Sequence, residues 1–213
     1  IYGNDSVNGD VNSSGQAADE AKNIFNGNRI HGFEGNDKIY GGKLIDSLWG
    51  DNGNDAIWGY AGNDFLYGGV GNDQLYGGPG NDKLNGGTGS DTLSGAEGND
   101  ILIGLSGADK FVFDTALDAS NNLDTIKDFA KGIDKIVLDD DVFTKLTGNT
   151  AGITLESKYL SSSWNPVDSN AYFYFKSSTL YYDSDGNGSG AAKAVVELVG
   201  ITSISASDIL IIS

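Results

Sequence analysis

A nine-residue period runs without a gap from Gly32 to Val112. The nine segments read GFEGNDKIY, GGKLIDSLW, GDNGNDAIW, GYAGNDFLY, GGVGNDQLY, GGPGNDKLN, GGTGSDTLS, GAEGNDILI and GLSGADKFV. The sixth residue is always Asp and the eighth is always large and apolar. A fixed period is typical of solenoids, in which each repeat buries its apolar side only against its neighbours. A flexible glycine-rich linker would not keep this register.

Each segment is expected to form a six-residue turn followed by a three-residue strand. Side chains alternate along a strand, so position eight points into a core while positions seven and nine point outward. Two segments would make one coil, and successive coils would pair in parallel about 4.8 Å apart. The expected fold class is all-β, a right-handed parallel β-roll at 32–112 followed by a capping β-strand region at 113–213.

The turns carry the residues expected to bind metal. Glycines at positions one, two and four permit φ above zero and let carbonyl oxygens approach the Asp at position six. Carboxylate and carbonyl oxygens are the ligands that calcium prefers. The predicted carboxylate ligands are Asp37, Asp46, Asp55, Asp64, Asp73, Asp82, Asp91, Asp100 and Asp109. The predicted carbonyl ligands are Gly32, Gly35, Gly41, Gly50, Gly53, Gly59, Gly62, Gly68, Gly71, Gly77, Gly80, Gly86, Gly89, Gly95, Gly98, Gly104 and Gly107. If each ion lies between turns n and n+2, nine turns provide about seven calcium sites.

The net charge supports a cation as the main partner. The chain has 30 acidic and 13 basic residues, a formal charge of -17. This balance argues against nucleic acid and anionic membrane surfaces as partners. Carboxylates stacked closer than the Debye length of about 10 Å repel one another, so the metal is expected to be part of the folding reaction. Without cysteine, disulfides and thiolate metal sites are excluded. The absence of a long apolar run predicts no membrane insertion, and we expect a monomer.

The array has irregular repeats. In GGKLIDSLW, Leu44 and Ile45 replace turn residues, so the sites beside Asp46 are expected to be weak or empty. Asn28 and Ala108 are milder departures. We interpret 1–31 as a degenerate N-terminal repeat with an inserted excursion, whose AADEAK portion favours a short helix.

After Val112 the composition changes to alternating apolar runs typical of strands. The expected strands are Lys110–Phe113, Thr125–Phe129, Lys135–Leu138, Ala171–Lys176, Leu180–Tyr182, Ala194–Leu198 and Ile209–Ile212. Asp183–Gly188 resembles the start of an EF-hand loop, but position twelve is Ala194 where Glu is required. A hairpin turn is the better interpretation.

The pattern GGxGxDxUx resembles that of the RTX exoproteins. That resemblance implies a roll that folds on meeting calcium outside the bacterium, in a secreted, extracellular protein. Asn122–Leu138 and Leu180–Gly188 are similar to the segment after the roll in serralysin-type metalloproteases and other type I secreted proteins. The resemblance implies the type I secretion apparatus as a partner and an uncleaved export signal. Asp208, Ile209, Leu210, Ile211 and Ile212 look like that signal, although a last β-strand explains them too.

No catalytic constellation is evident. The chain has one histidine, His31, so neither a HExxH zinc site nor a histidine-based triad can form. Gly104–Ala108 narrowly fails the GxSxG pattern. We expect a non-catalytic module, with any enzyme activity in an upstream part of a larger exoprotein.

Aromatic residues fill position nine in five consecutive segments: Tyr40, Trp49, Trp58, Tyr67 and Tyr76. They should form two outward ladders, because odd and even segments lie on opposite faces. One interpretation is stacking between neighbouring strands. The alternative is a flat platform for a polysaccharide, as the resemblance to alginate epimerase calcium modules would allow. Ice binding is set aside because position three lacks a regular Thr row.

Overall fold

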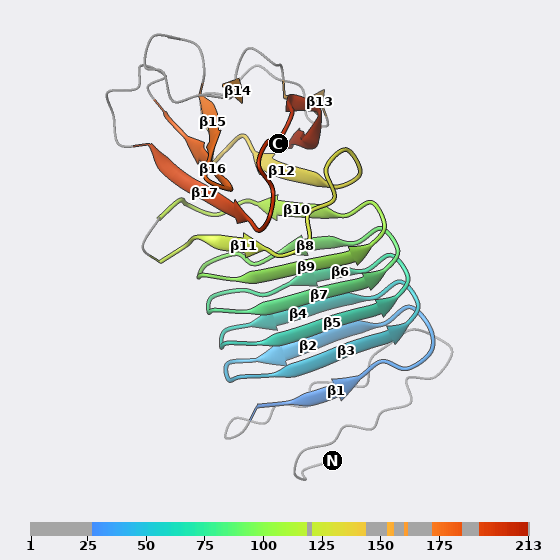
Figure 1. Cartoon of the computed structure of the whole chain (residues 1–213). Coiled ribbons are helices and arrows are strands. Elements are labelled where there is room, and N and C mark those ends of the chain that lie inside the picture. The colour runs from blue at the N-terminus through green and yellow to red at the C-terminus, as the bar shows by residue number, and fades with distance from the viewer. Residues whose placement is uncertain are drawn as a thin grey trace.

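The computed structural model describes residues 27–118, 121–143, 153–155, 160–161, 172–184 and 192–212. The repeat array forms a stack of short strands joined by tight turns (Figure 1). These strands are β1 (Arg29–His31), β2 (Lys38–Gly42), β3 (Ser47–Asn52), β4 (Ala56–Tyr60), β5 (Phe65–Val70), β6 (Gln74–Tyr76), β7 (Lys83–Thr88), β8 (Thr92–Ser94), β9 (Ile101–Ser106) and β10 (Lys110–Phe113). Within the described ranges, no helix has the length and hydropathy that a membrane crossing requires.

Odd-numbered and even-numbered strands of the array form two separate parallel sheets. One sheet runs β1-β3-β5-β7-β9 and the other runs β10-β8-β6-β4-β2. Ile39 of β2 pairs with Ile57 of β4, and Leu48 of β3 pairs with Leu66 of β5. Each partner is therefore two segments away in the sequence. This register confirms the parallel β-roll and its coil of two nonapeptides.

The core is the column of side chains at position eight. All nine are fully buried: Ile39, Leu48, Ile57, Leu66, Leu75, Leu84, Leu93, Leu102 and Phe111. Side-chain alternation in the short strands directs them between the two sheets, as expected. Burying one such side chain contributes about 1.5–3 kcal/mol.

The C-terminal strands extend both sheets beyond the repeats. They are β11 (Asp124–Ile126), β12 (Lys135–Asp139), β13 (Ile153–Thr154), β14 (Leu160–Ser161), β15 (Phe173–Lys176), β16 (Thr179–Tyr182), β17 (Lys193–Leu198) and β18 (Ile209–Ile212), with a 3₁₀ turn at Ala206–Asp208 before β18. One sheet continues β9-β11-β17-β16-β15-β14, and the other continues β10-β12-β18-β13. Parallel pairing persists through β17 and β18 before antiparallel strands follow. Figure 1 shows these strands stacked beyond β9 and β10.

The expected C-terminal strands are all present with small shifts in their bounds. The largest shift is at Thr125–Phe129, where β11 ends at Ile126. Beyond it, the carboxylate of Asp128 accepts hydrogen bonds from the backbone N–H groups of Gly104 and Leu105. The chain turns there to make these contacts, so the strand cannot continue. The AADEAK portion and most of the Asp183–Gly188 loop lie outside the described residues.

Two neighbouring residues on opposite faces of β9 test the core. Leu102→Ala should destabilise the calcium-loaded chain by about 2–5 kcal/mol, because it leaves a cavity in the column. Ile101→Ala should cost much less, since Ile101 is 37% exposed. Urea unfolding of both variants in calcium measures the difference. Equal losses of stability would contradict the assignment of the core.

Candidate metal centre

The nine position-six aspartates, here called the Asp row, form two buried columns at the edges of the roll. Each is 1 or 2% exposed. Along each column, the backbone N–H of one aspartate donates to Oδ1 of the aspartate in the next coil. Asp37 donates to Asp55 at 2.8 Å, and Asp55 donates to Asp73 at 2.7 Å. The same contact joins Asp46, Asp64, Asp82, Asp91, Asp100 and Asp109 into their columns. One oxygen of each of these acceptor carboxylates is thus fixed by the stack.

The second carboxylate oxygen has no such partner. Oδ2 is buried and lacks a hydrogen bond in Asp37, Asp46, Asp55, Asp64, Asp73, Asp82, Asp91 and Asp100, and Asp37 also has an unpartnered Oδ1. Leaving a buried polar atom unsatisfied costs about 1–3 kcal/mol, and more if it is charged. A bound cation would satisfy such an acceptor directly, and protonation would remove its charge. The row therefore fits a series of bound cations.

Position-one glycines are needed for close approach. At Gly50, a Cβ would lie 2.2 Å from Oδ2 of Asp55 and 2.6 Å from the carbonyl oxygen of Gly68 in the next coil. The position-one glycines do not have positive φ, which corrects the expectation that they are needed for that conformation. Removing the side chain brings carboxylate and carbonyl oxygens together, as a calcium shell requires.

Positive φ occurs instead at positions two and four of the eight other segments, but not at Gly42 or Leu44 of the irregular one. Gly53, at position four, has φ +136, and a Cβ there would lie 1.6 Å from the carbonyl oxygen of Gly35. Position two is left-handed even where it is not glycine: Phe33, Asp51, Tyr60, Ala96 and Leu105 have φ between 67 and 71. A residue with Cβ pays about 1–2 kcal/mol for this conformation. Contacts between stacked turns must therefore impose the turn shape, and glycine at position two is not required.

Burial disfavours the ionised form of the carboxyl groups in the Asp row. Desolvation by burial, together with repulsion from the carboxylates of neighbouring coils, raises the pKa of Asp82 to about 8 and that of Asp73 to about 7. The same causes raise the pKa of Asp55 and Asp64 to about 6. Without a cation, part of the row would be protonated at neutral pH. A divalent cation removes that need because it compensates the negative charge directly.

The irregular repeat has a different turn conformation but keeps its aspartate in the column, since neither Gly42 nor Leu44 has positive φ. Asp46 accepts a short hydrogen bond at Oδ1 from the backbone N–H of Asn28, and its Oδ2 is buried without a partner. The carbonyl oxygen of Leu44 would lie 2.6 Å from a Cβ on Gly62, whereas in a regular pair of turns the carbonyl oxygen of Gly35 would lie 1.6 Å from a Cβ on Gly53. Ile45 is 58% exposed. The substitutions leave the Asp46 carboxylate in register, and a weak site there stays a prediction.

Two further aspartates continue the columns, and the repeat count missed both. Asp124 accepts at Oδ1 from the N–H of Asp100, and Asp134 accepts at Oδ1 from the N–H of Asp109, both at 3.0 Å. Both carboxylates are buried. The available signal was the triplet of Asp, any residue and Ile, which recurs at 124–126 and 134–136 without the turn glycines.

The aromatic residues form the two expected ladders. Rings of Tyr40 and Trp58 stack at 4.9 Å, Trp58 and Tyr76 at 5.6 Å, and Trp49 and Tyr67 at 5.5 Å. His31 adds to the second ladder, 4.4 Å from Trp49. Because neighbouring rings lie face to face, each inner ring turns its edge to solvent. This favours strand–strand stacking, and the polysaccharide platform stays a prediction.

Four residues of the expected export signal, Ile209–Ile212, form strand β18 in the folded chain, and Asp208 ends the 3₁₀ turn before it. Ile209 and Ile211 are fully buried in β18, which pairs with β12. Asp208 is also fully buried, and its two oxygens accept from the N–H groups of Gly132 and Ser205 at 3.0 and 2.7 Å. The last-strand interpretation is therefore correct for the folded state, and the export role stays a prediction.

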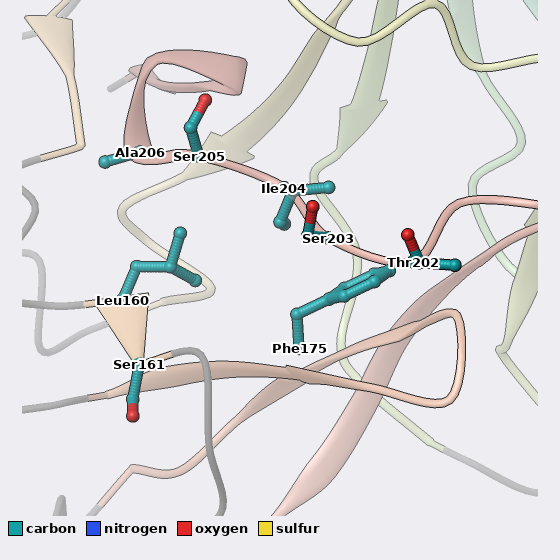
Figure 2. A pocket seen from close by; sticks show the side chains of 8 residues that line it. All are labelled: Leu160, Ser161, Phe175, Thr202, Ser203, Ile204, Ser205 and Ala206. Atoms are coloured by element: carbon teal, nitrogen blue, oxygen red, sulfur yellow. The ribbon is translucent and has the colours of Figure 1, made fainter.

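A small cavity lies in the C-terminal region, away from the Asp row. Its volume is about 250 Å³. Figure 2 shows apolar side chains of Leu160, Phe175 and Ile204 together with hydroxyl groups of Thr202 and Ser203. Among the described residues, its lining contains no charged or imidazole group.

Comparison with known proteins agrees with this geometry. The family model described as the RTX calcium-binding nonapeptide repeat matches residues 27–48, 44–75 and 76–111. No curated protein is similar enough to count as a match. The AlgE6R3 subunit of the Azotobacter vinelandii mannuronan C5-epimerase, known from a solution structure, is 27% identical with a TM-score of 0.27, over 79% of this chain and 78% of that one. The extracellular lipase LipA from Serratia marcescens is 16% identical with a TM-score of 0.33, over 85% of this chain and 40% of the lipase. The buried Asp row and the matched repeat model together identify residues 27–111 as RTX calcium-binding nonapeptide repeats folded into a parallel β-roll.

Proposed function

We propose that this chain is a module that folds on calcium outside the bacterial cell and supports type I secretion and stability of a larger exoprotein. The observation that carries the proposal is the column of buried carboxylate oxygens without hydrogen-bond partners, from Asp37 to Asp100. No protein donor among the described residues satisfies these oxygens, and bound cations or protonation would compensate them. The stability of the roll therefore depends on the cations and protons in solution, whereas that of an apolar core alone would not.

About seven calcium ions would occupy the array, each between the turns of successive coils. Their ligands would be Asp-row carboxylates and carbonyl oxygens of the turn glycines. The close approach seen at Gly50, where Asp55 Oδ2 and the Gly68 carbonyl oxygen converge, supports this assignment. Bound calcium supplies positive charge that cancels repulsion within each column.

Folding would then be coupled to calcium concentration. The chain carries a formal charge of -17, and burying its carboxylates without compensation is costly. Inside a cell, where free calcium is scarce, we expect the roll to stay unfolded. Outside, calcium binding contributes directly to the folding free energy, as in other metal-dependent domains.

This coupling would also make the export signal accessible. In the folded chain, Asp208, Ile209 and Ile211 are fully buried. A secretion apparatus that reads these residues could do so only before the chain folds. Calcium outside the cell would then fold the exported chain.

We place catalysis, if the whole protein has it, outside this chain. The single histidine, His31, stacks on Trp49, and its Nδ1 lies 3.0 Å from Asp51 at the surface of the roll. The buried carboxylates of the Asp row are accounted for by metal binding. Neither group is arranged with a nucleophile among the described residues.

Calcium should switch the chain from coil to β structure. In chelator at neutral pH we expect a far-UV circular dichroism spectrum of unfolded chain, and a cooperative transition to β structure as calcium is added. Magnesium should be ineffective, because it keeps its water and demands octahedral geometry. A fully ordered β spectrum in chelator at neutral pH would contradict the proposal.

Acid should partly replace calcium. The folded pKa values of Asp82 and Asp73 lie above the ordinary value of 3.8. The calcium-free folded state thus holds more protons than the unfolded state between about pH 4 and about pH 8, and its stability falls as pH rises through that window. Far-UV circular dichroism in calcium-free buffer should therefore show more β structure at pH 5 than at pH 8.

Asp82→Asn provides the matched control for this pH dependence. It removes a group whose folded pKa is raised to about 8, so the amount of β structure in calcium-free buffer should depend less on pH than in the unsubstituted chain. The interpretation fails if the calcium-free chain is more stable at pH 8 than at pH 5.

A further inference from the structure

We propose that the pairs Asn52–Gly53 and Asn85–Gly86 are sites of spontaneous deamidation, which the folded roll suppresses and the calcium-free chain does not. The modification ends the ability of the chain to fold, so calcium determines how long the chain remains able to fold. The inference rests on the proposed function, because calcium controls this reaction only if it folds the chain. Water is the other reactant, and ammonia is the product that leaves.

An asparagine that precedes glycine can react with the next peptide bond. The backbone nitrogen of the glycine attacks Cγ of the asparagine and forms a C–N bond. The side-chain NH₂ group leaves as ammonia, together with the proton of the glycine N–H. Water then opens the succinimide ring at either carbonyl, which gives aspartate or isoaspartate. Glycine favours the attack because it has no Cβ to obstruct it and its backbone rotates freely.

The array separates reactive from unreactive asparagines by their position in the repeat. Asn52 is at position three and Asn85 at position nine, each directly before a glycine. Further Asn–Gly pairs at 8–9, 26–27 and 187–188 involve residues outside the described ranges. Position-five asparagines precede the Asp row, whose Cβ atoms hinder the same attack. They are Asn36, Asn54, Asn63, Asn72, Asn81 and Asn99.

In the folded roll, Asn52 and Gly53 are held by hydrogen bonds to the coils on both sides. The N–H of Asn52 donates to the carbonyl oxygen of Phe33 at 2.7 Å, and its side-chain amide donates to Glu34 at 2.8 Å. The attacking nitrogen is also engaged, because the N–H of Gly53 donates to the carbonyl oxygen of Val70 at 2.8 Å. These contacts must break before the nitrogen can reach Cγ.

Asn85 lies inside its sheet, where β7 has a neighbouring strand on each side. It pairs with Tyr67 of β5 and with Ile103 of β9. Gly86 is buried, and a Cβ there would lie 2.3 Å from Oδ2 of Asp91. Rotation of the peptide between Asn85 and Gly86 would disrupt both ladders. The reaction therefore requires local opening of the stack, which is rare in a folded sheet.

Isoaspartate would not fit at either place. It adds one methylene group to the main chain, which lengthens the chain by about 1.5 Å. Directly after Gly86, a Cβ on Gly87 would lie 2.1 Å from the carbonyl oxygen of Gly69. A Cβ on Gly53 would lie 1.6 Å from the carbonyl oxygen of Gly35. Turns stacked this closely leave no room for a displaced backbone, so the modified coil loses its register.

Peptide mapping by mass spectrometry measures the reaction in the full chain. After incubation at mildly alkaline pH, deamidation at Asn52 and Asn85 should be slower in calcium than in chelator by about tenfold or more, because it requires local opening. Asn54 should stay unmodified in both samples. Equal rates in a chain that circular dichroism shows to be folded by calcium would overturn the proposal and leave the proposed function intact.

Refolding of aged chains tests the consequence of the modification. An Asn52→Ser, Asn85→Ser double variant uses residues that the array already has at these positions, Ser106 and Ser94. After ageing in chelator, this variant should regain more β structure on addition of calcium than the unsubstituted chain. Asn54→Ser is the matched control and should regain no more than the unsubstituted chain.

Two outcomes of the refolding experiment contradict the proposal. The first is equal recovery by the unsubstituted chain and the double variant after the same ageing. The second is isoaspartate from Asn52 or Asn85 in the refolded fraction as often as in the fraction that stays unfolded. A fresh, unmodified chain that calcium does not fold would overturn the proposed function and this inference together.

Discussion

A single hydrogen bond organises the roll: the N–H of one position-six aspartate donates to Oδ1 of the aspartate one coil further along. It sets the register of the turns and fixes one oxygen of each acceptor carboxylate. The other oxygen is then held in a buried place that no protein donor reaches. Stacking and cation binding are therefore two consequences of the same contact, because packing the coils also buries the second carboxylate oxygen of each aspartate without a protein donor.

The column of apolar side chains and the columns of carboxylates contribute oppositely to stability. Position-eight residues such as Leu66 and Leu75 are fully buried and favour folding under all conditions. The Asp row opposes folding wherever its charge is not compensated, as the raised pKa of Asp82 shows. Because protein stability is a small difference between large terms, the second contribution can decide whether the first prevails.

The first C-terminal strands continue the parallel stack of the repeats before the pairing changes. β11 and β12 keep the parallel register, and Asp124 and Asp134 take the places of the next aspartates in the columns. Backbone donors progressively take over the acceptor oxygens, until both oxygens of Asp134 and both of Asp208 are satisfied. Antiparallel pairing begins beyond the parallel strands, between β18 and β13 in one sheet and between β17 and β16 in the other. A metal-dependent stack is thus joined to an ordinary hydrogen-bonded sheet region.

The sequence by itself determined the period, the core column at position eight and the Asp row, because a repeated pattern must place equivalent residues in equivalent surroundings. It did not give the reason for glycine at position one, which depends on an oxygen from the next coil beside Asp55. It also missed Asp124 and Asp134, since their loops have other lengths and lack the turn glycines. Only the tertiary structure decided these points, because they depend on contacts between coils. The residues in contact are far apart in the sequence, so a nine-residue pattern does not show their distances.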